Sequence, residues 1–219
     1  SEPAFGFIAD LAAPLEGEPP APMKSRFSPR FCFSYFGMTG DPFLGSTSDT
    51  YPDGLLARLA ASGVDGVWLQ GVLYTLAPFP WDESRSARYE ERLENLRELV
   101  ARAKKHGIRL YLYLNEPRAM PVAFFEGRED LRGVTAGDYA ALCTSNPDVQ
   151  RFIRESVASI CRAVPDLGGF FSISGSENLT NCWSHYQGTN CPRCGRRTPG
   201  EVIAEVNGLF LEGIREAGG

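Results

Sequence analysis

Four short apolar runs occur along the chain, and each is followed by a longer stretch whose apolar residues recur at helical spacing. The runs predict strands at residues 31–36, 66–70, 108–114 and 169–173. The longer stretches predict helices at residues 51–62, 83–106, 146–164 and 199–214. A strand followed by a helix, repeated four times, is typical of parallel βαβ units with right-handed crossovers.

Local signals support the boundaries of these helices. Gly63 follows the first predicted helix, as a C-cap glycine would. The third helix is expected to open at Asn146-Pro147-Asp148, where an N-cap residue precedes a proline and an acid. Thr198 and Glu201 have the spacing of a capping box, which predicts the start of the last helix.

The repeated units predict an α/β fold of the (β/α)8 TIM-barrel type, of which this chain holds about the first four βα units. The predicted strands end in polar residues, at Gln70, Asn115-Glu116 and Ser176-Glu177. A barrel of this type carries its chemistry at those ends. No predicted strand is followed by a glycine-rich phosphate-binding motif, which disfavours the nucleotide-binding α/β folds.

Two regions are expected from this count of units. Residues 1–30, rich in proline and glycine, are interpreted as an extended lead-in or as the end of a preceding domain. Residues 31–219 are interpreted as the N-terminal half of a catalytic barrel domain. Because a barrel needs eight strands, the remainder is expected from the same polypeptide or from a partner subunit.

Composition excludes several classes of partner. The chain of 219 residues carries a formal net charge of −5 and has no block of lysine and arginine, so nucleic acid is not expected to bind. No apolar run approaches the roughly 20 residues needed to cross a bilayer, so no membrane is expected either. No signal peptide is recognised, although the chain does not begin with Met, so the compartment stays open.

Four of the six cysteines lie in polar segments and predict a zinc site. Cys191 and Cys194 have the spacing of a metal-binding knuckle, and Cys182 lies nearby in sequence as a third ligand. The fourth ligand is either Cys143 or His185. Four protein ligands leave no open position, so a zinc ion bound at this loop, residues 182–194, is expected to be structural. Reduced, metal-binding cysteines slightly favour a cytoplasmic location.

Two glutamates are candidates for catalysis because each follows a predicted strand. Paired carboxylates across a pocket are what glycoside hydrolysis requires. Glu177 is interpreted as the catalytic acid, against the alternative of a loop-capping carboxylate. Glu116 is interpreted either as a second catalytic carboxylate or as the partner of Arg118 in an ion pair.

The span from residue 140 to residue 195 resembles the middle of family 42 β-galactosidases and related barrel glycosidases of the same clan. The resemblance rests on a cysteine before a helix, an acid at the end of a strand and a cysteine-rich loop after it. It implies that Glu177 is the acid/base residue. It also implies that the zinc ligands are Cys143, Cys182, Cys191 and Cys194. Ser176 stands where that family has an asparagine, and Asn115-Glu116-Pro117 resembles instead a motif of family 5 glycosidases.

The resemblance implies a retaining glycoside hydrolase with a carbohydrate substrate, whose nucleophile lies on a later strand that this chain does not supply. Asn115, Trp68, Gln70 and Trp183 are the candidate substrate-binding residues. A family 20-like β-N-acetylhexosaminidase is an alternative, although that family has an Asp where Ser176 stands. A non-catalytic, zinc-stapled carbohydrate-binding or interaction domain is the alternative from another class.

Overall fold

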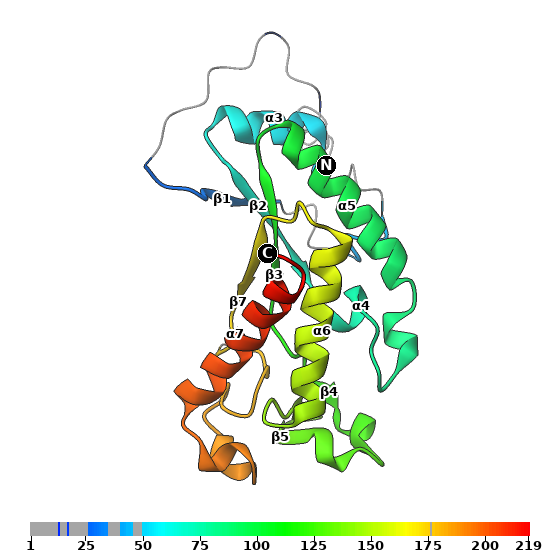
Figure 1. Cartoon of the computed structure of the whole chain (residues 1–219), viewed down its shortest axis with the longest axis vertical. Helices are drawn as coiled ribbons and strands as arrows, with labels where there is room; N and C mark the ends of the chain where they lie inside the picture. Colours follow the sequence, from blue (N-terminus) through cyan, green and yellow to red (C-terminus); the bar gives the residue numbers. More distant parts are fainter. Residues whose placement is uncertain (1–12, 14–16, 18–25, 35–39, 46–49, 176) are drawn as a thin grey trace, which may run out of the picture. The chain divides into compact units, whose positions relative to one another are not determined.

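A computed structural model of the chain describes residues 13, 17, 26–34, 40–45, 50–175 and 177–219. The chain divides into two compact units. Figure 1 labels the helices and strands that are described below. The first unit comprises Ser1–Gln70, Glu90–Tyr113 and Ala163–Phe170, and the second comprises Gly71–Tyr89, Leu114–Arg162 and Phe171–Gly219. Most of the predicted lead-in, and the end of the first predicted strand, lie outside the described residues.

A four-stranded parallel sheet confirms the predicted α/β fold class. Its strands are β1 (Phe31–Phe33), β2 (Gly66–Gly71), β3 (Arg109–Leu114) and β7 (Gly169–Ser172), in the order β1-β2-β3-β7. β1 pairs with β2 in parallel, with Phe31 opposite Gly66. The spatial order follows the chain order of the four strands, as it does in successive βαβ units.

The main helices are α3 (Asp53–Ala61), α5 (Tyr89–Lys105), α6 (Pro147–Ala163) and α7 (Pro199–Glu216), with a short α4 at Leu73–Leu76. The predicted capping box is present, because the Thr198 side chain accepts from the Glu201 amide and the Glu201 carboxylate accepts from the Thr198 amide. Asn146 caps α6, since its Oδ1 accepts from the Asp148 amide at 2.8 Å.

The predicted helix at residues 83–106 begins later than expected. Residues Glu83–Ser86 form a separate 3-10 helix, η2, whose N-cap Asp82 accepts from the Ser84 amide. Arg88 then adopts a left-handed backbone conformation with φ of 65°, which no helix continues through. For this reason α5 starts at Tyr89.

A second, antiparallel sheet follows β3 and was not predicted from the sequence. It consists of β4 (Met120–Pro121), β5 (Arg132–Ala136) and β6 (Tyr139–Leu142), in the order β4-β6-β5. Two short 3-10 helices, η3 (Val122–Phe125) and η4 (Glu129–Leu131), connect β4 to β5. The pairing of β5 with β6 is irregular between Arg132 and Thr135, so Gly133 lies at a bulge.

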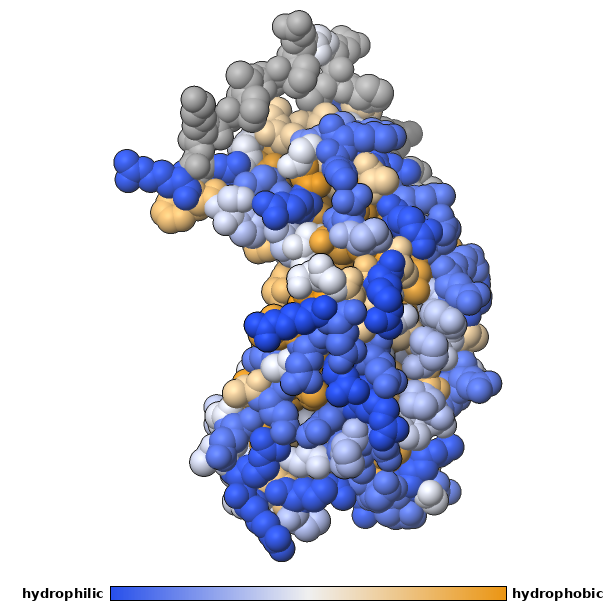
Figure 2. All heavy atoms as spheres, in the orientation of Figure 1, coloured by the Kyte–Doolittle hydropathy of each residue, from blue (hydrophilic) through white to orange (hydrophobic). Residues whose placement is uncertain are grey.

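The described helices are amphipathic, and hydrophilic side chains cover most of the face seen in Figure 2. Within the second unit α7 packs closely on α6, since a Cβ atom at Gly213 would lie 2.5 Å from the Arg154 carbonyl oxygen. Among the described residues, no helix has the length and apolar character needed to cross a membrane.

Tyr51 ties the segments next to β1 and β2 together within the first unit. Its side chain is fully buried; its hydroxyl donates to the Trp68 carbonyl at 2.7 Å and accepts from the Ser34 amide at 3.1 Å. We predict that Tyr51→Phe lowers the free energy of unfolding by about 1–3 kcal/mol, because both bonds are lost in a buried site. Urea denaturation measures the loss, and Tyr186→Phe, at an exposed tyrosine, is the control. Equal effects of the two substitutions would contradict this role.

Candidate metal centre and carboxylates

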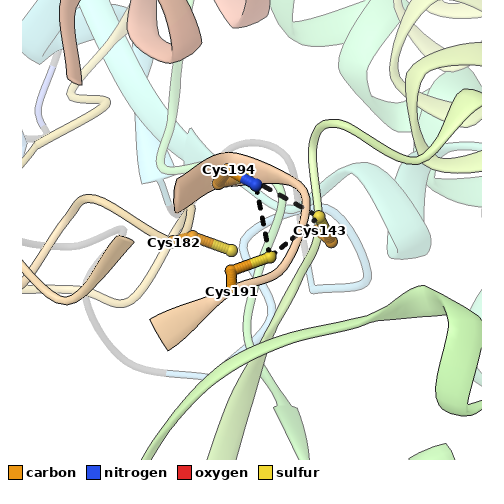
Figure 3. A group of neighbouring side chains, drawn as sticks. All are labelled: Cys143, Cys182, Cys191 and Cys194. Atoms are coloured by element: carbon orange, nitrogen blue, oxygen red, sulfur yellow. Dashed lines mark hydrogen bonds between the residues drawn. The ribbon is translucent and has the colours of Figure 1, made fainter. Parts of the chain in front are cut away.

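Four cysteines from two segments far apart in the sequence meet in the second unit (Figure 3). Cys143 directly follows β6, and its amide donates to the Leu131 carbonyl at 2.8 Å. The other three lie between β7 and α7. There, two single-turn helices, η5 (Gly188–Asn190) and η6 (Cys194–Arg196), are the regular structure around the knuckle.

The four sulfur atoms form a compact, buried cluster. All lie within 4.8 Å of one another, and Cys143 Sγ is 3.7 Å from both Cys191 Sγ and Cys194 Sγ. A tetrahedral zinc with zinc–sulfur bonds of about 2.3 Å places its sulfurs about 3.8 Å apart. The four thiols are unpaired by disulfides. Their spacing and chemistry therefore fit one tetrahedral thiolate-bound ion.

His185, the alternative fourth ligand, is engaged elsewhere. Its Nε2 atom lies 2.9 Å from the Glu177 carbonyl oxygen, and the four-cysteine group does not include it. The structure thus brings together the ligand set in which Cys143 is the fourth member.

Hydrogen bonds within the cluster favour the thiolate at Cys143 and the thiol at Cys182 and Cys194. Hydrogen bonds from Cys182 and Cys194, together with one from the Arg193 guanidinium, hold the pKa of Cys143 far below its ordinary value. The pKa of Cys182 is raised because it donates to Cys143. Arg193 Nε lies 3.2 Å from Cys143 Sγ, and Ser145 Oγ lies 3.3 Å from Cys194 Sγ. The sequence did not identify Arg193 and Ser145 as partners of the cysteine sulfurs, because an arginine or a serine next to a cysteine is common on protein surfaces.

Close packing fixes the position of the Cys182 sulfur. A Cβ atom at Gly133 would lie only 2.5 Å from Cys182 Sγ, so the bulge in β5 admits the sulfur only because position 133 has no side chain. Trp183 packs in the same way, since a Cβ at Gly188 would fall 2.1 Å from its ring. The Trp183 indole also donates to the Cys194 carbonyl at 3.2 Å. The predicted contact of Trp183 with substrate stays a prediction.

Glu177 is exposed and lies on the segment that runs from β7 into this cluster. A hydrogen-bonded turn fastens the segment: Asn181 Nδ2 and Thr180 Oγ1 donate to the Ser174 carbonyl at 2.5 and 3.2 Å. The buried Ser184 hydroxyl accepts from the amides of Thr180 and Asn181. Together with the His185 bond to the Glu177 carbonyl, this turn links the glutamate backbone to the cysteine loop. Ser176 lies outside the described residues.

Glu116 occupies a different environment from that of Glu177. Its carboxylate is 2 % exposed, and its two oxygens accept from the amides of Leu73 and Arg118, each at 2.9 Å. Burial raises the pKa of Glu116 to about 7, although the Leu73 amide, the charge of Arg118 and the Arg118 amide pull it down. Asn115 beside it is also buried. Both oxygens of Glu116 therefore hold backbone in place.

Trp68 and Gln70, the other candidate substrate-binding residues, lie on β2 in the first unit. The Trp68 ring stacks on Phe33 with centroids 4.0 Å apart and meets Tyr113 edge-on at 5.3 Å. Gln70 is exposed at the end of the strand. Their role in binding stays a prediction.

Comparisons with known proteins give a limited likeness. No protein-family model and no curated protein sequence matches the chain. Among solved structures, the chain is similar to a protein described as GH5_18 from Streptomyces cattleya in complex with GlcNAc, with 18 % identity and a TM-score of 0.49 over 88 % of this chain. It is also similar to a chitobiase from Flavobacterium johnsoniae, with 15 % identity and a TM-score of 0.46 over 74 % of this chain.

A third solved structure, the AHE enzyme from Alicyclobacillus herbarius, matches 74 % of this chain with 14 % identity and a TM-score of 0.42. The aligned region covers 43 %, 27 % and 33 % of the GH5_18, chitobiase and AHE chains. The chain thus spans less than half the length of each of these proteins.

The close contact between Gly133 and Cys182 predicts that adding one methyl group at position 133 weakens zinc binding. We expect the purified chain to bind about one zinc ion, and Gly133→Ala to bind it at least about tenfold more weakly, because the methyl displaces a ligand sulfur. Competition with a chromophoric chelator measures the affinity. Gly208→Ala on α7, where a Cβ meets nothing within 4 Å, is the matched control. Unchanged zinc affinity in Gly133→Ala would refute this packing argument.

The burial of Glu116 predicts a pH-dependent cost of Glu116→Gln. The amide replaces one acceptor oxygen with a donor that faces a backbone N–H, so the variant is less stable. The folded pKa of Glu116 is raised, so its contribution to stability is full below the unfolded pKa and is lost as pH rises through about 7. The cost of the substitution should therefore shrink by on the order of 2 kcal/mol between pH 5 and pH 8.

Urea denaturation of both proteins at the two pH values measures this change, since the other titrating groups cancel in the difference. Glu126→Gln, at an exposed glutamate, should cost little at either pH. A cost of Glu116→Gln that is the same at pH 5 and pH 8 would show that the carboxyl does not titrate in this range.

Proposed function

We propose that the chain is part of a barrel glycoside hydrolase in which Glu177 is the general acid/base and the four cysteines hold a structural zinc. One observation carries the proposal: an exposed glutamate follows a parallel strand on a segment fastened to a buried four-cysteine cluster. The resemblance of residues 140–195 to family 42 β-galactosidases supports it, because that family has an acid and a cysteine-rich loop in the same order.

The bound zinc would be held by Cys143, Cys182, Cys191 and Cys194. Four thiolates complete its coordination, so it would supply a cross-link between the end of β6 and the loop before α7. Arg193 would offset part of the negative charge of the thiolates. This cross-link would hold the loop that follows Glu177 in one conformation.

Glu177 would act on the glycosidic oxygen. Its protonated carboxyl gives a proton to the departing oxygen as the bond to the anomeric carbon breaks. In the retaining mechanism that the resemblance implies, the resulting carboxylate then takes a proton from the water that releases the sugar. The nucleophile would be a second carboxylate from a later strand. Glu116 is less suited to either role, since its oxygens already accept two backbone amides.

The proposal includes a partner for the sheet. β1 and β7 are the outer strands of the described parallel sheet. Further strands, from the same polypeptide or from a partner subunit, would pair with them and complete a barrel. The substrate would be a carbohydrate, and neither nucleic acid nor membrane is part of the proposal.

We predict that Glu177→Gln lowers kcat on aryl glycosides by about 10²–10⁴-fold in the complete polypeptide or assembly, because the leaving oxygen loses its proton donor. Zinc content and folding should be unchanged. Glu126→Gln is the matched control and should retain full turnover. The 219-residue chain alone is expected to be inactive, since the nucleophile is missing.

Two results would contradict the proposal, the first the role of Glu177 and the second the glycosidase activity itself. Unchanged turnover in Glu177→Gln would remove this residue from catalysis. A complete polypeptide that binds oligosaccharides but hydrolyses none of a broad panel would instead support the second candidate, a zinc-stapled carbohydrate-binding domain.

A further inference from the structure

A hollow of about 520 Å³ lies between residues 77–81 and α6, entirely within the second unit. Its lining includes neither the four cysteines nor Glu177 or Glu116. Hollows of a few hundred Å³ are the usual size of small-molecule sites. This one is therefore a separate candidate site.

Trp81 and Phe152 are the aromatic residues of the lining, and packing holds the Trp81 ring in place. Phe79, two residues earlier, is 1 % exposed and anchors the segment, while Pro78 and Pro80 fix its backbone. The Trp81 ring meets Phe79 edge-on at 5.2 Å and Phe152 of α6 at 5.5 Å. The indole is half-buried, and packing has already fixed its orientation before any ligand arrives.

Polar side chains from one face of α6 complete the lining. Asp148, Arg151 and Glu155 are three and four residues apart, so they lie in a row along the helix. Arg151 donates to the Asp148 carboxylate at 2.5 Å, and both side chains are about half exposed. Ser156 and Ser159 add hydroxyl groups to the same surface. The row thus offers both hydrogen-bond donors and acceptors beside the aromatic ring.

We propose that this hollow, the Trp81 site, binds a pyranose ring of a neutral oligosaccharide. A pyranose has an apolar face of C–H groups that packs on an aromatic ring and a rim of hydroxyls that both donate and accept. Trp81 supplies the aromatic ring for the apolar face, and the carboxylates and guanidinium of the α6 row supply partners for the hydroxyls. An anionic ligand is disfavoured because the lining has two carboxylates and one guanidinium. A cationic ligand is disfavoured because Arg151 already pairs with Asp148.

The Trp81 site goes beyond the proposed function, because it would hold glycan at a place other than the bond that is cleaved. It does not depend on Glu177 and would operate equally in a non-catalytic carbohydrate-binding domain. Glu177→Gln therefore leaves it intact, and failure of one proposal does not decide the other.

The test titrates the chain with soluble tetrasaccharides of glucose, galactose, mannose and N-acetylglucosamine, followed by NMR of the indole N–H signals. The chain has three tryptophans, and Trp81→Phe assigns the signal of Trp81. At least one of these neutral probes should shift that signal. Arg151→Ala and Trp81→Ala should each weaken its binding at least about tenfold. The matched controls Arg162→Ala, also on α6, and Tyr186→Ala lie outside the hollow and should bind as the native chain does.

Because Trp81→Ala also removes packing against Phe79 and Phe152, a second variant keeps the test decisive. Ser159→Tyr places a large side chain at a half-buried position of the lining while leaving Trp81 in place, and it should abolish the shift of the Trp81 signal. The proposal is overturned if no probe shifts the Trp81 signal, or if binding survives both Arg151→Ala and Ser159→Tyr. Binding of an oligolysine peptide in place of every neutral sugar would overturn it as well.

Discussion

The second unit depends on the approach of four cysteine sulfurs to within 4.8 Å of one another. The pairs that involve Cys143 are separated by 48 and 51 residues, so the cluster joins the end of β6 to the long segment after β7. That segment has only single helical turns in its interior and pairs with no strand among the described residues. Burial of the sulfurs, with the donors from Arg193 and Ser145, is what organises it.

The constraint on the sulfurs extends outward to the proposed acid. Cys182 is next to Asn181, whose side chain holds the Ser174 carbonyl, and His185 holds the Glu177 carbonyl. Glu177 thus has an exposed side chain, while its carbonyl is held by His185 from the cysteine loop. An acid of the proposed kind needs both an accessible carboxyl and a main chain held by its surroundings.

Periodicity predicted the parallel strands and main helices because β2, β3 and α6 are long enough to show their pattern. The antiparallel sheet was missed because β4 has two residues and β6 four, too few for alternation to be visible. The start of α5 was missed because the left-handed conformation of Arg88 depends on surroundings that the sequence pattern does not contain.

The candidate site was predictable in part. The cysteine spacing and the order of acid and loop could be read from the sequence. The sequence left Cys143 and His185 open as the fourth ligand, and the structure groups Cys143 with the other three cysteines. The need for glycine at position 133 could not be predicted from the sequence. It arises because the bulge in β5 packs against the Cys182 sulfur, which comes from a distant loop. The burial of Glu116 could not be predicted either, since an Asn-Glu-Pro sequence is equally compatible with an exposed carboxylate.

The depth of the cysteine cluster would also set how fast a bound ion could leave. The four residues are at most 2 % exposed, so neither a chelator nor an oxidant reaches the sulfurs while the loop is closed. Exchange of a bound ion would then require local opening of the segment between β7 and α7, and its rate would be the rate of that opening. The lifetime of the ion and the conformational order of the loop that carries Glu177 would consequently be one kinetic property of the molecule.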